Sequence, residues 1–147
     1  MTRKQKTVSK ILELKEFKKE QLQSEVGKAQ ERLNHEQAIV DDLEATYKQT
    51  NADFMIKQMS RTIPVCEVDL CYTYLKHLNA KIEQQKRIVA TSAAELEKIR
   101  TAMVEAYKEQ HLIALLHDKI VQEQNKEADH CEQRESDYNF LSRKTEA

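Results

Sequence analysis

Glycine, proline and aromatic residues are scarce in this sequence, and tryptophan is absent. Its 147 residues include one glycine, Gly27, one proline, Pro64, and 5% aromatic residues. Turns and strand connections depend on glycine and proline, so this scarcity excludes a fold with many chain reversals. No apolar run approaches the ~18 residues that span a membrane, and the amino-terminal residues lack the pattern of a signal peptide. We therefore expect a cytoplasmic protein without direct membrane insertion.

The few cysteines and histidines lack the spacing of a chemical site. Cys66, Cys71 and Cys131 are an odd number without a recognisable spacing, which indicates a reducing compartment rather than a disulfide framework. His111 and His117 are six residues apart, whereas two zinc ligands on one helical face are four apart. There is no glycine-rich phosphate loop, and no nucleophile can be matched to a base. We expect no catalytic, cofactor-binding or metal site, and no enzyme.

Charged residues are abundant but balanced. Lysine and arginine number 24 against 25 acidic residues, a formal net charge of −1, which gives no indication of nucleic-acid binding. The two ends of the chain differ, because residues 1–20 carry seven basic and three acidic residues, whereas residues 121–147 carry four basic and seven acidic residues. This asymmetry indicates either a contact with a partner or simply a solvated helix surface.

Apolar residues recur along most of the chain at alternating spacings of four and three. In residues 22–54, eight of the ten positions in this register are apolar or aromatic, and in residues 68–120 twelve of sixteen are apolar. Such a heptad pattern is typical of helices that pair along a narrow seam. The predicted seam residues are Leu22, Val26, Leu33, Val40, Leu75, Ile82, Val89, Leu96, Ile99 and Met103.

One interruption separates the two stripes. The residue before Pro64 avoids helical geometry, and proline itself suits the first turn of a new helix. We predict an all-α fold of two long antiparallel helices that form a coiled-coil hairpin. Helix one is expected at about 8–58, the loop at about 59–66 and helix two at about 67–141, within a single domain 1–147. The second helix is longer and overhangs the first.

The stripe is irregular at both ends. Carrying the later register back from Leu22 places Lys15 and Lys19 in the seam, which indicates a break in phase near residues 14–22. After Val121 the apolar content falls, as expected for a helix that has lost its intramolecular partner. Such a segment is a marginal helix when isolated, so it either frays or is ordered by a partner.

Aromatic residues gather near the expected hairpin tip. Tyr47 and Phe54 fall in the seam, whereas Tyr72 and Tyr74 flank it and are expected to be at least half exposed. Exposed aromatic side chains at the end of a polar rod suit a docking surface, and they equally suit a cap over the end of the helix pair.

Three stretches of the sequence have a familiar pattern, namely residues 11–20 (ILELKEFKKE), residues 72–85 (YTYLKHLNAKIEQQ) and, more loosely, residues 124–137 (QNKEADHCEQRESD). They resemble the flagellar export protein FliJ family of type III secretion. The resemblance extends over most of the chain. Stalk proteins of injectisomes share this architecture, so the flagellar and the injectisome role both stay open.

The resemblance implies a stalk-like coiled coil at the flagellar base, peripheral to the inner membrane. Its partners would be the hexameric export ATPase, the cytoplasmic domain of the export gate membrane protein, and export chaperones that it escorts or recycles. The open end, with both termini, would contact the ATPase, through Ile11, Leu14, Phe17, Ile120 and Val121. The hairpin tip would contact the gate, through Leu43, Tyr47, Tyr74 and Leu78.

Three other interpretations compete with the export stalk. The chain could be a scaffold or adaptor that dimerises through the overhang of helix two, a small helical chaperone that holds a client, or a metal sensor that uses histidine and cysteine. All of them share the all-α fold and differ in the partner that is bound.

Overall fold

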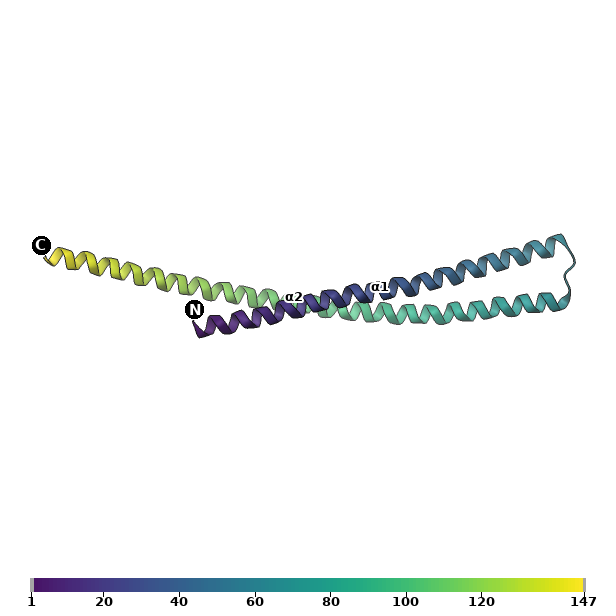
Figure 1. Cartoon of the computed structure of the whole chain (residues 1–147), viewed down its shortest axis with the longest axis horizontal. Helices are drawn as coiled ribbons and strands as arrows, with labels where there is room; N and C mark the ends of the chain where they lie inside the picture. Colours follow the sequence, from purple (N-terminus) through teal and green to yellow (C-terminus); the bar gives the residue numbers. More distant parts are fainter. Residues whose placement is uncertain (1, 147) are drawn as a thin grey trace. The chain divides into compact units, whose positions relative to one another are not determined.

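Two long helices make up the structure. The computed structural model describes residues 2–146, in which α1 (Arg3–Ser60) is followed by α2 (Val65–Glu146). Figure 1 shows one short connection between the two helices. The helices pack against each other and the described residues contain no strand, so the expected all-α hairpin is confirmed.

α1 begins at Arg3, five residues before the expected start at Val8. The hydroxyl oxygen of Thr2 accepts a hydrogen bond from the backbone N–H of Gln5 at 3.3 Å, and its carbonyl accepts one from Lys6 at 3.1 Å. A threonine in this position caps a helix by satisfying N–H groups of the first turn. The cap explains why a polar segment without apolar periodicity is still helical.

The connection, residues 61–64, is shorter than the expected loop. The carbonyl of Pro64 accepts hydrogen bonds from the N–H groups of Glu67 and Val68, at 3.1 and 3.2 Å, so α2 starts directly after the proline. The guanidinium of Arg61 lies 3.7 Å from the carboxylate of Glu67 and bridges the same turn. α2 continues to Glu146, because no glycine or proline interrupts it.

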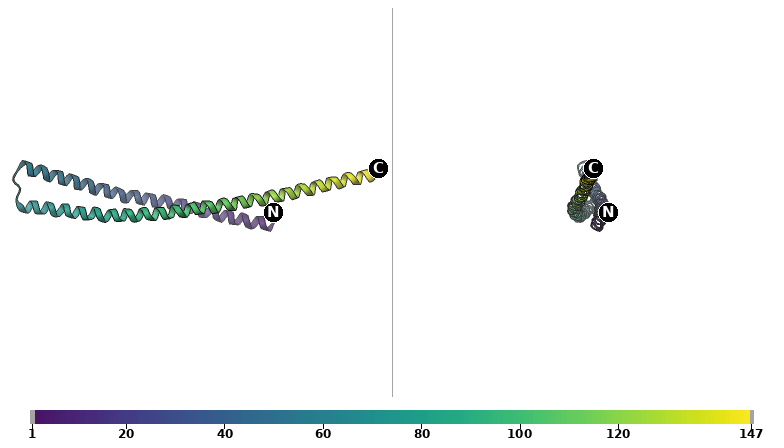
Figure 2. Two further views of the ribbon diagram at one scale, coloured as in Figure 1. Left: turned by 180° about the vertical axis from the view of Figure 1, so that it is seen from behind. Right: turned by 90° about the vertical axis from the view of Figure 1, so that its left-hand side faces the viewer.

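By its internal contacts the chain divides into two compact units. Residues 22–101, here called the hairpin unit, contain the later part of α1, the connection and the first part of α2. The described residues 2–21 and 102–146, here called the terminal unit, contain the start of α1 and the remainder of α2. In each unit a segment of α1 lies beside a segment of α2 in both views (Figures 1 and 2).

The hairpin unit has an apolar seam. Its buried hydrophobic side chains all occupy the alternating four-and-three register, and Leu22, Val26, Leu33, Val89 and Ile99 of the same register are half-buried. Removing these side chains from water supplies most of the stabilisation, at about 25 cal/mol per Å² of apolar surface. The buried hydrophobic residues of this unit are Val40, Phe54, Leu75, Leu78, Ile82 and Leu96.

Polar contacts across the seam set the pairing of the two helices in the hairpin unit. The side-chain amide of Gln85 donates to the backbone carbonyl of Glu36 at 3.2 Å and also to the carboxylate of Glu36. The guanidinium of Arg100 donates to the side-chain oxygen of Gln30 at 2.9 Å, and Lys86 lies 3.4 Å from Glu44. A polar layer inside an apolar seam disfavours shifted pairings, since a shift would leave it unsatisfied.

The terminal unit contains fewer buried side chains, namely Val8, Ala106 and Ile120. Met103, predicted for the seam, is half-buried here. The seam of this unit is partly ionic, because the ammonium of Lys15 on α1 lies 2.8 Å from a carboxylate oxygen of Glu109 on α2.

The expected break in phase near residues 14–22 is wrong. Val8, Leu12, Lys15 and Lys19 keep the alternating spacing, and they are the buried or half-buried residues on this side of α1. The two lysines are tolerated there because Lys15 pairs with Glu109, while the ammonium of Lys19 lies 5.1 Å from the centre of the ring of Tyr107.

Residues 125–146 of α2, here called the α2 extension, continue past the start of α1. The side-chain amide of Gln124 donates to the hydroxyl of Thr2 at 2.6 Å, which is the last cross-helix contact before the extension. Side chains 125–141 are all exposed, and no other segment lies beside this part of α2 in either view (Figures 1 and 2).

Candidate binding surfaces

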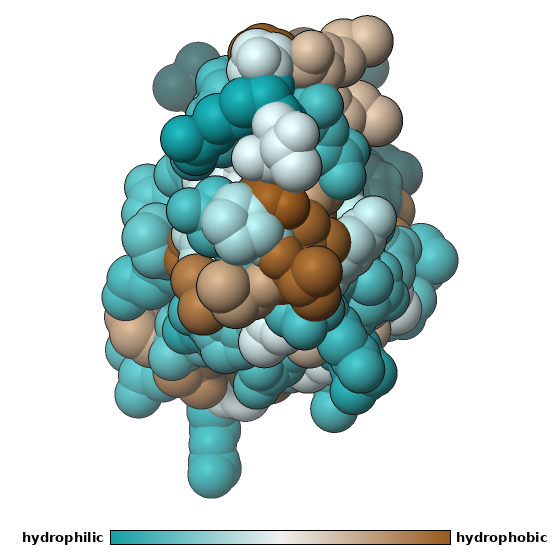
Figure 3. Space-filling view, turned by 90° about the vertical axis from the view of Figure 1, so that its right-hand side faces the viewer, coloured by the Kyte–Doolittle hydropathy of each residue, from teal (hydrophilic) through white to brown (hydrophobic). Residues whose placement is uncertain are grey.

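The hairpin end of the hairpin unit exposes apolar side chains. Figure 3, which looks onto this end, shows a group of hydrophobic side chains with hydrophilic ones around it. The exposed large residues near the connection, none of them in the seam register, are Met55, Ile56, Met59, Val65 and Leu70. An exposed apolar patch with a polar rim is typical of a protein-binding site.

Two hollows at this end share Leu70 and Tyr74. One, of about 230 Å³, is also lined by Phe54, Ile63 and Cys71, and the other is lined by residues of α2 that include Cys66 and His77. We call Ile63, Cys66, Leu70, Tyr74 and His77 the tip surface. Leu70 was missed from the sequence, although its apolar side chain lies outside the seam register and close to Pro64.

The four residues predicted at the hairpin tip are not equally accessible. Tyr74 is 46% exposed, whereas Leu78 is 4% exposed and belongs to the seam. Leu43 and Tyr47 are half-buried. Of the aromatic residues that flank the seam, Tyr72 packs edge-to-face on Phe54, with ring centres 5.6 Å apart, so it covers the seam with one edge of its ring.

The start of α1 in the terminal unit presents a basic and apolar surface. Leu14 and Phe17 are 68% and 66% exposed, and Ile11 is 37% exposed. Lys10 and Lys18 are four residues before and after Leu14, so they lie on the same face of the helix. We call Lys10, Ile11, Leu14, Phe17 and Lys18 the α1 outer face. Of its members, Leu14 and Phe17 point away from the seam residue Lys19, whereas Lys18 is near enough to α2 for its charge to act on Glu109.

The other two residues predicted at the open end are much less accessible. Ile120 is 5% exposed and Val121 is half-buried. Instead, α2 exposes a different set of apolar residues in this unit, which the heptad register did not select because they lie outside it. They are Val104, Leu112, Leu115 and Leu116.

The fold lowers the pKa of the carboxyl group of Glu109. A hydrogen bond from Lys15 holds the pKa of Glu109 below its ordinary value of 4.5, and the positive charges of Lys15 and Lys18 lower it further. This carboxylate therefore remains ionised well into mild acid, and the contact across the terminal unit persists with it.

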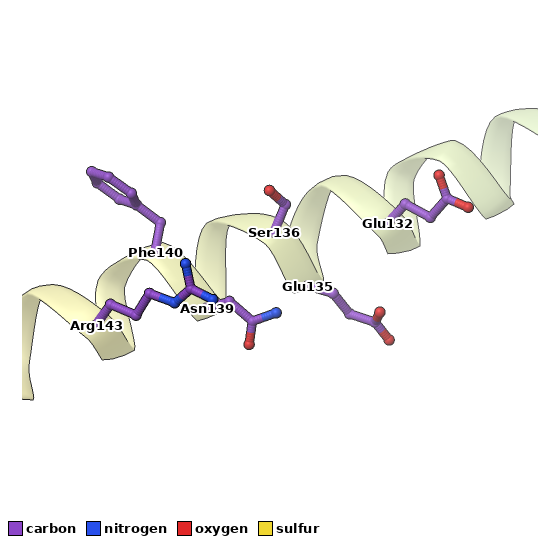
Figure 4. Close-up of a pocket in the computed structure, with 6 residues that line it drawn as sticks. All are labelled: Glu132, Glu135, Ser136, Asn139, Phe140 and Arg143. Carbon is purple, nitrogen blue, oxygen red and sulfur yellow. The ribbon is translucent and has the colours of Figure 1, made fainter.

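The α2 extension has a hollow that is lined by one helix only. Figure 4 shows its lining side chains projecting from α2, with Glu132, Ser136 and Phe140 on one side of the ribbon. The remaining lining residues are Glu135, Asn139 and Arg143. A binding pocket needs walls from several directions, so this is an open helix surface.

Two kinds of feature are absent from the described residues. No group of three or more histidine, cysteine, aspartate or glutamate residues in 2–146 could hold a metal ion. In the same part of the chain no helix has an apolar stretch long enough to cross a membrane.

One of three comparisons with known proteins gave a match. The family model described as Flagellar FliJ protein matches residues 5–142. A search of curated proteins found no significant match, and neither did a search of solved structures. The match includes the α1 outer face, the tip surface and most of the α2 extension.

Proposed function

Because the chain belongs to the Flagellar FliJ protein family, we propose that it acts in flagellar protein export as a binding protein whose two units contact different partners. The family is a non-catalytic component of flagellar export. Its flagellar description favours the flagellar role over the injectisome role. The terminal unit is the proposed contact for the export ATPase, and the hairpin unit is the proposed contact for the export gate.

The α1 outer face is the observation on which the ATPase contact depends. A leucine and a phenylalanine, Leu14 and Phe17, are about two-thirds exposed, while two lysines occupy the seam positions beside them. Large apolar side chains that are exposed together are typical of a surface that a partner protein covers. The basic residues Lys10 and Lys18 on the same face would favour an acidic groove in that partner.

The tip surface supports a separate contact with the cytoplasmic domain of the export gate. Leu70 is 75% exposed and Tyr74 is 46% exposed, and the two line both hollows at the hairpin end. A leucine and a tyrosine around a shallow apolar hollow are suited to receive a side chain from another protein. Of the residues implied by the resemblance, Tyr74 is the one we assign to direct contact. Export chaperones are further proposed partners, without a surface assigned to them.

A test with two variants separates the proposed contacts. The double variant Leu14→Asp, Phe17→Asp should weaken binding to the purified export ATPase by about tenfold or more and reduce any stimulation of ATP hydrolysis, while binding to the gate domain is retained. Tyr74→Ala should do the reverse. Each is measured by calorimetric titration, and swimming of the corresponding strains is recorded.

The matched control is Glu16→Gln, a change next to Phe17 but outside the α1 outer face. It should bind both partners normally, and circular dichroism should show unchanged helix content in all variants. If the double variant and Tyr74→Ala weaken both contacts equally, or if neither affects any contact, the division of roles between the two units is wrong.

A further inference from the structure

No segment of the described chain covers the α2 extension, and the line of seam positions continues along it with polar residues first and two large apolar residues near its end. From Ile120, which is buried against α1, the spacing of four and three leads through Gln124 and on into the extension. Tyr138 and Leu141 on this line are 72% and 60% exposed. An isolated helix of about this length is marginal in water, so a stripe of this kind gains stability when another helix covers it. The positions of the line in the extension are Glu127, Cys131, Arg134, Tyr138 and Leu141.

The charge of the extension is opposite to that of the start of α1. Residues 125–146 carry six acidic and four basic residues, a net charge of −2, whereas residues 3–20 carry seven basic and three acidic residues, a net charge of +4. Both segments also expose large apolar side chains, Tyr138 and Leu141 on one and Leu14 and Phe17 on the other. The two surfaces therefore complement each other in charge and in apolar character.

Within one chain these two surfaces cannot meet. Thr2 contacts Gln124, and from that point the continuous helix moves away from α1 by 1.5 Å for each further residue. On α1, Leu14 and Phe17 also point away from the seam residue Lys19, whose ammonium lies over the ring of Tyr107 of α2. The complement must therefore come from another molecule.

We propose that two copies of the chain associate through their terminal units, with the α1 outer face of each copy receiving the α2 extension of the other. Each copy supplies both surfaces, so the contact is reciprocal and closes at two chains. The pairing covers Leu14 and Phe17 with Tyr138 and Leu141 of the second copy, and brings Lys10 and Lys18 near its acidic residues. The dimer would also mask the proposed ATPase contact, although its existence does not depend on that contact.

Analytical ultracentrifugation of the purified full chain alone tests the association. We expect the mass to rise from one chain to two with concentration, and Leu141→Asp or Phe17→Asp should weaken the association by about tenfold or more. Phe140→Asp is the matched control: Phe140 is 67% exposed, and its position next to Leu141 puts it on another side of the helix. It should dimerise normally. Raised salt should also weaken the association, because charged residues on both surfaces contribute.

A disulfide experiment tests the arrangement itself. One chain carries Phe17→Cys and a tagged second chain carries Leu141→Cys, each with its own three cysteines replaced by serine. Mixing the two under mild oxidation should give a linked pair, whereas Glu16→Cys in place of Phe17→Cys should give much less. Circular dichroism of every variant confirms that its helices are intact.

Three results would overturn the proposal. The first is a single-chain mass at every concentration. The second is a dimer whose dissociation constant is the same for Leu141→Asp and Phe17→Asp as for the control Phe140→Asp. The third is equal linking at positions 16 and 17. A monomer that instead sediments with vesicles of anionic lipid would show that a membrane surface covers the α1 outer face. All these measurements use this chain alone, so failure of the ATPase contact would not affect them.

Discussion

The two units use the same helices in opposite ways. Along the hairpin unit, away from the connection, the apolar residues of the seam face inward, and Leu75, Leu78 and Ile82 are buried between α1 and α2. In the terminal unit lysines occupy seam positions, while Leu14 and Phe17 face outward. Away from its tip surface the hairpin unit thus uses its apolar side chains for its own stability, whereas the terminal unit leaves apolar side chains exposed along the start of α1. A long coiled coil can combine both, since each turn of helix is stabilised mainly by its local contacts.

The largest expected effect is that of a charge in the seam of the hairpin unit. Leu78→Asp should lower the free energy of unfolding by about 3–5 kcal/mol, because it buries an unpaired carboxylate and removes an apolar side chain. Leu14→Asp, the same change at an exposed site of the terminal unit, should alter it by less than about 0.5 kcal/mol. Urea unfolding followed by circular dichroism measures both. Similar losses for the two variants would contradict the difference between the units.

The next effect concerns the polar layer of the hairpin unit. Gln85→Ala should lower the free energy of unfolding by about 1–3 kcal/mol, since the half-buried carboxylate of Glu36 then loses its hydrogen-bond donor. The double change Glu36→Leu, Gln85→Leu should restore most of this stability or exceed it, because an apolar pair replaces a polar one. Urea unfolding of the single variants Glu36→Leu and Gln85→Leu and of the double variant gives the coupling energy. If the losses in free energy of unfolding of the two single variants add up to that of the double variant, the contact between Gln85 and Glu36 does not stabilise the seam.

A smaller gain in stability is expected at Gly27 in the hairpin unit. No atom lies within 4 Å of the position where a Cβ would be added, and no glycine has a positive φ among the described residues. Gly27→Ala should therefore stabilise the unit by about 0.5–1 kcal/mol, because alanine loses less backbone freedom on folding. Thermal unfolding measures the gain in stability, and hydrogen exchange at residues 22–60 shows whether it lies in this part of α1. An unchanged or lower melting temperature would mean that the helix needs the glycine.

The smallest effect is a local response of the terminal unit to acid. The pKa of Glu109 is lowered in the folded chain by Lys15, so the contact is fully formed above its ordinary value of 4.5 and is lost as the pH falls through the lowered pKa. The protection of residues 3–21 against hydrogen exchange, taken relative to the intrinsic exchange rate at each pH, should therefore fall in acid. The variant Glu109→Gln should remove this pH dependence.

The matched control for this response is Glu105→Gln, which breaks a contact between Glu105 and Lys108 within α2 alone. It should leave the acid response of residues 3–21 intact. Equal responses of the two variants would show that the contact with Lys15 does not hold the two helices together.

The sequence predicted the fold well and the accessible surfaces only in part. The alternating register identified the positions that are buried or half-buried in the hairpin unit, and Pro64 located the connection. The helix starts were less well predicted, because the cap at Thr2 depends on one side chain and not on periodicity. Ile120, Val121 and Leu78 were expected to meet partners, but periodicity does not distinguish an apolar residue that faces a second helix from one that faces a partner.

By itself, the sequence determined that two helices form, that they run antiparallel and which stripe pairs them, because the period of a helix and the effect of one proline are local properties. Only the tertiary structure decided which side of the first turns of α1 faces α2. A continuous helix cannot rotate its first turns without breaking its own hydrogen bonds, so Lys15 and Lys19 lie in the seam despite their charge. Glu109 and Tyr107, about ninety residues away in sequence, compensate for them. Leu14 and Phe17 are left outside for the same reason.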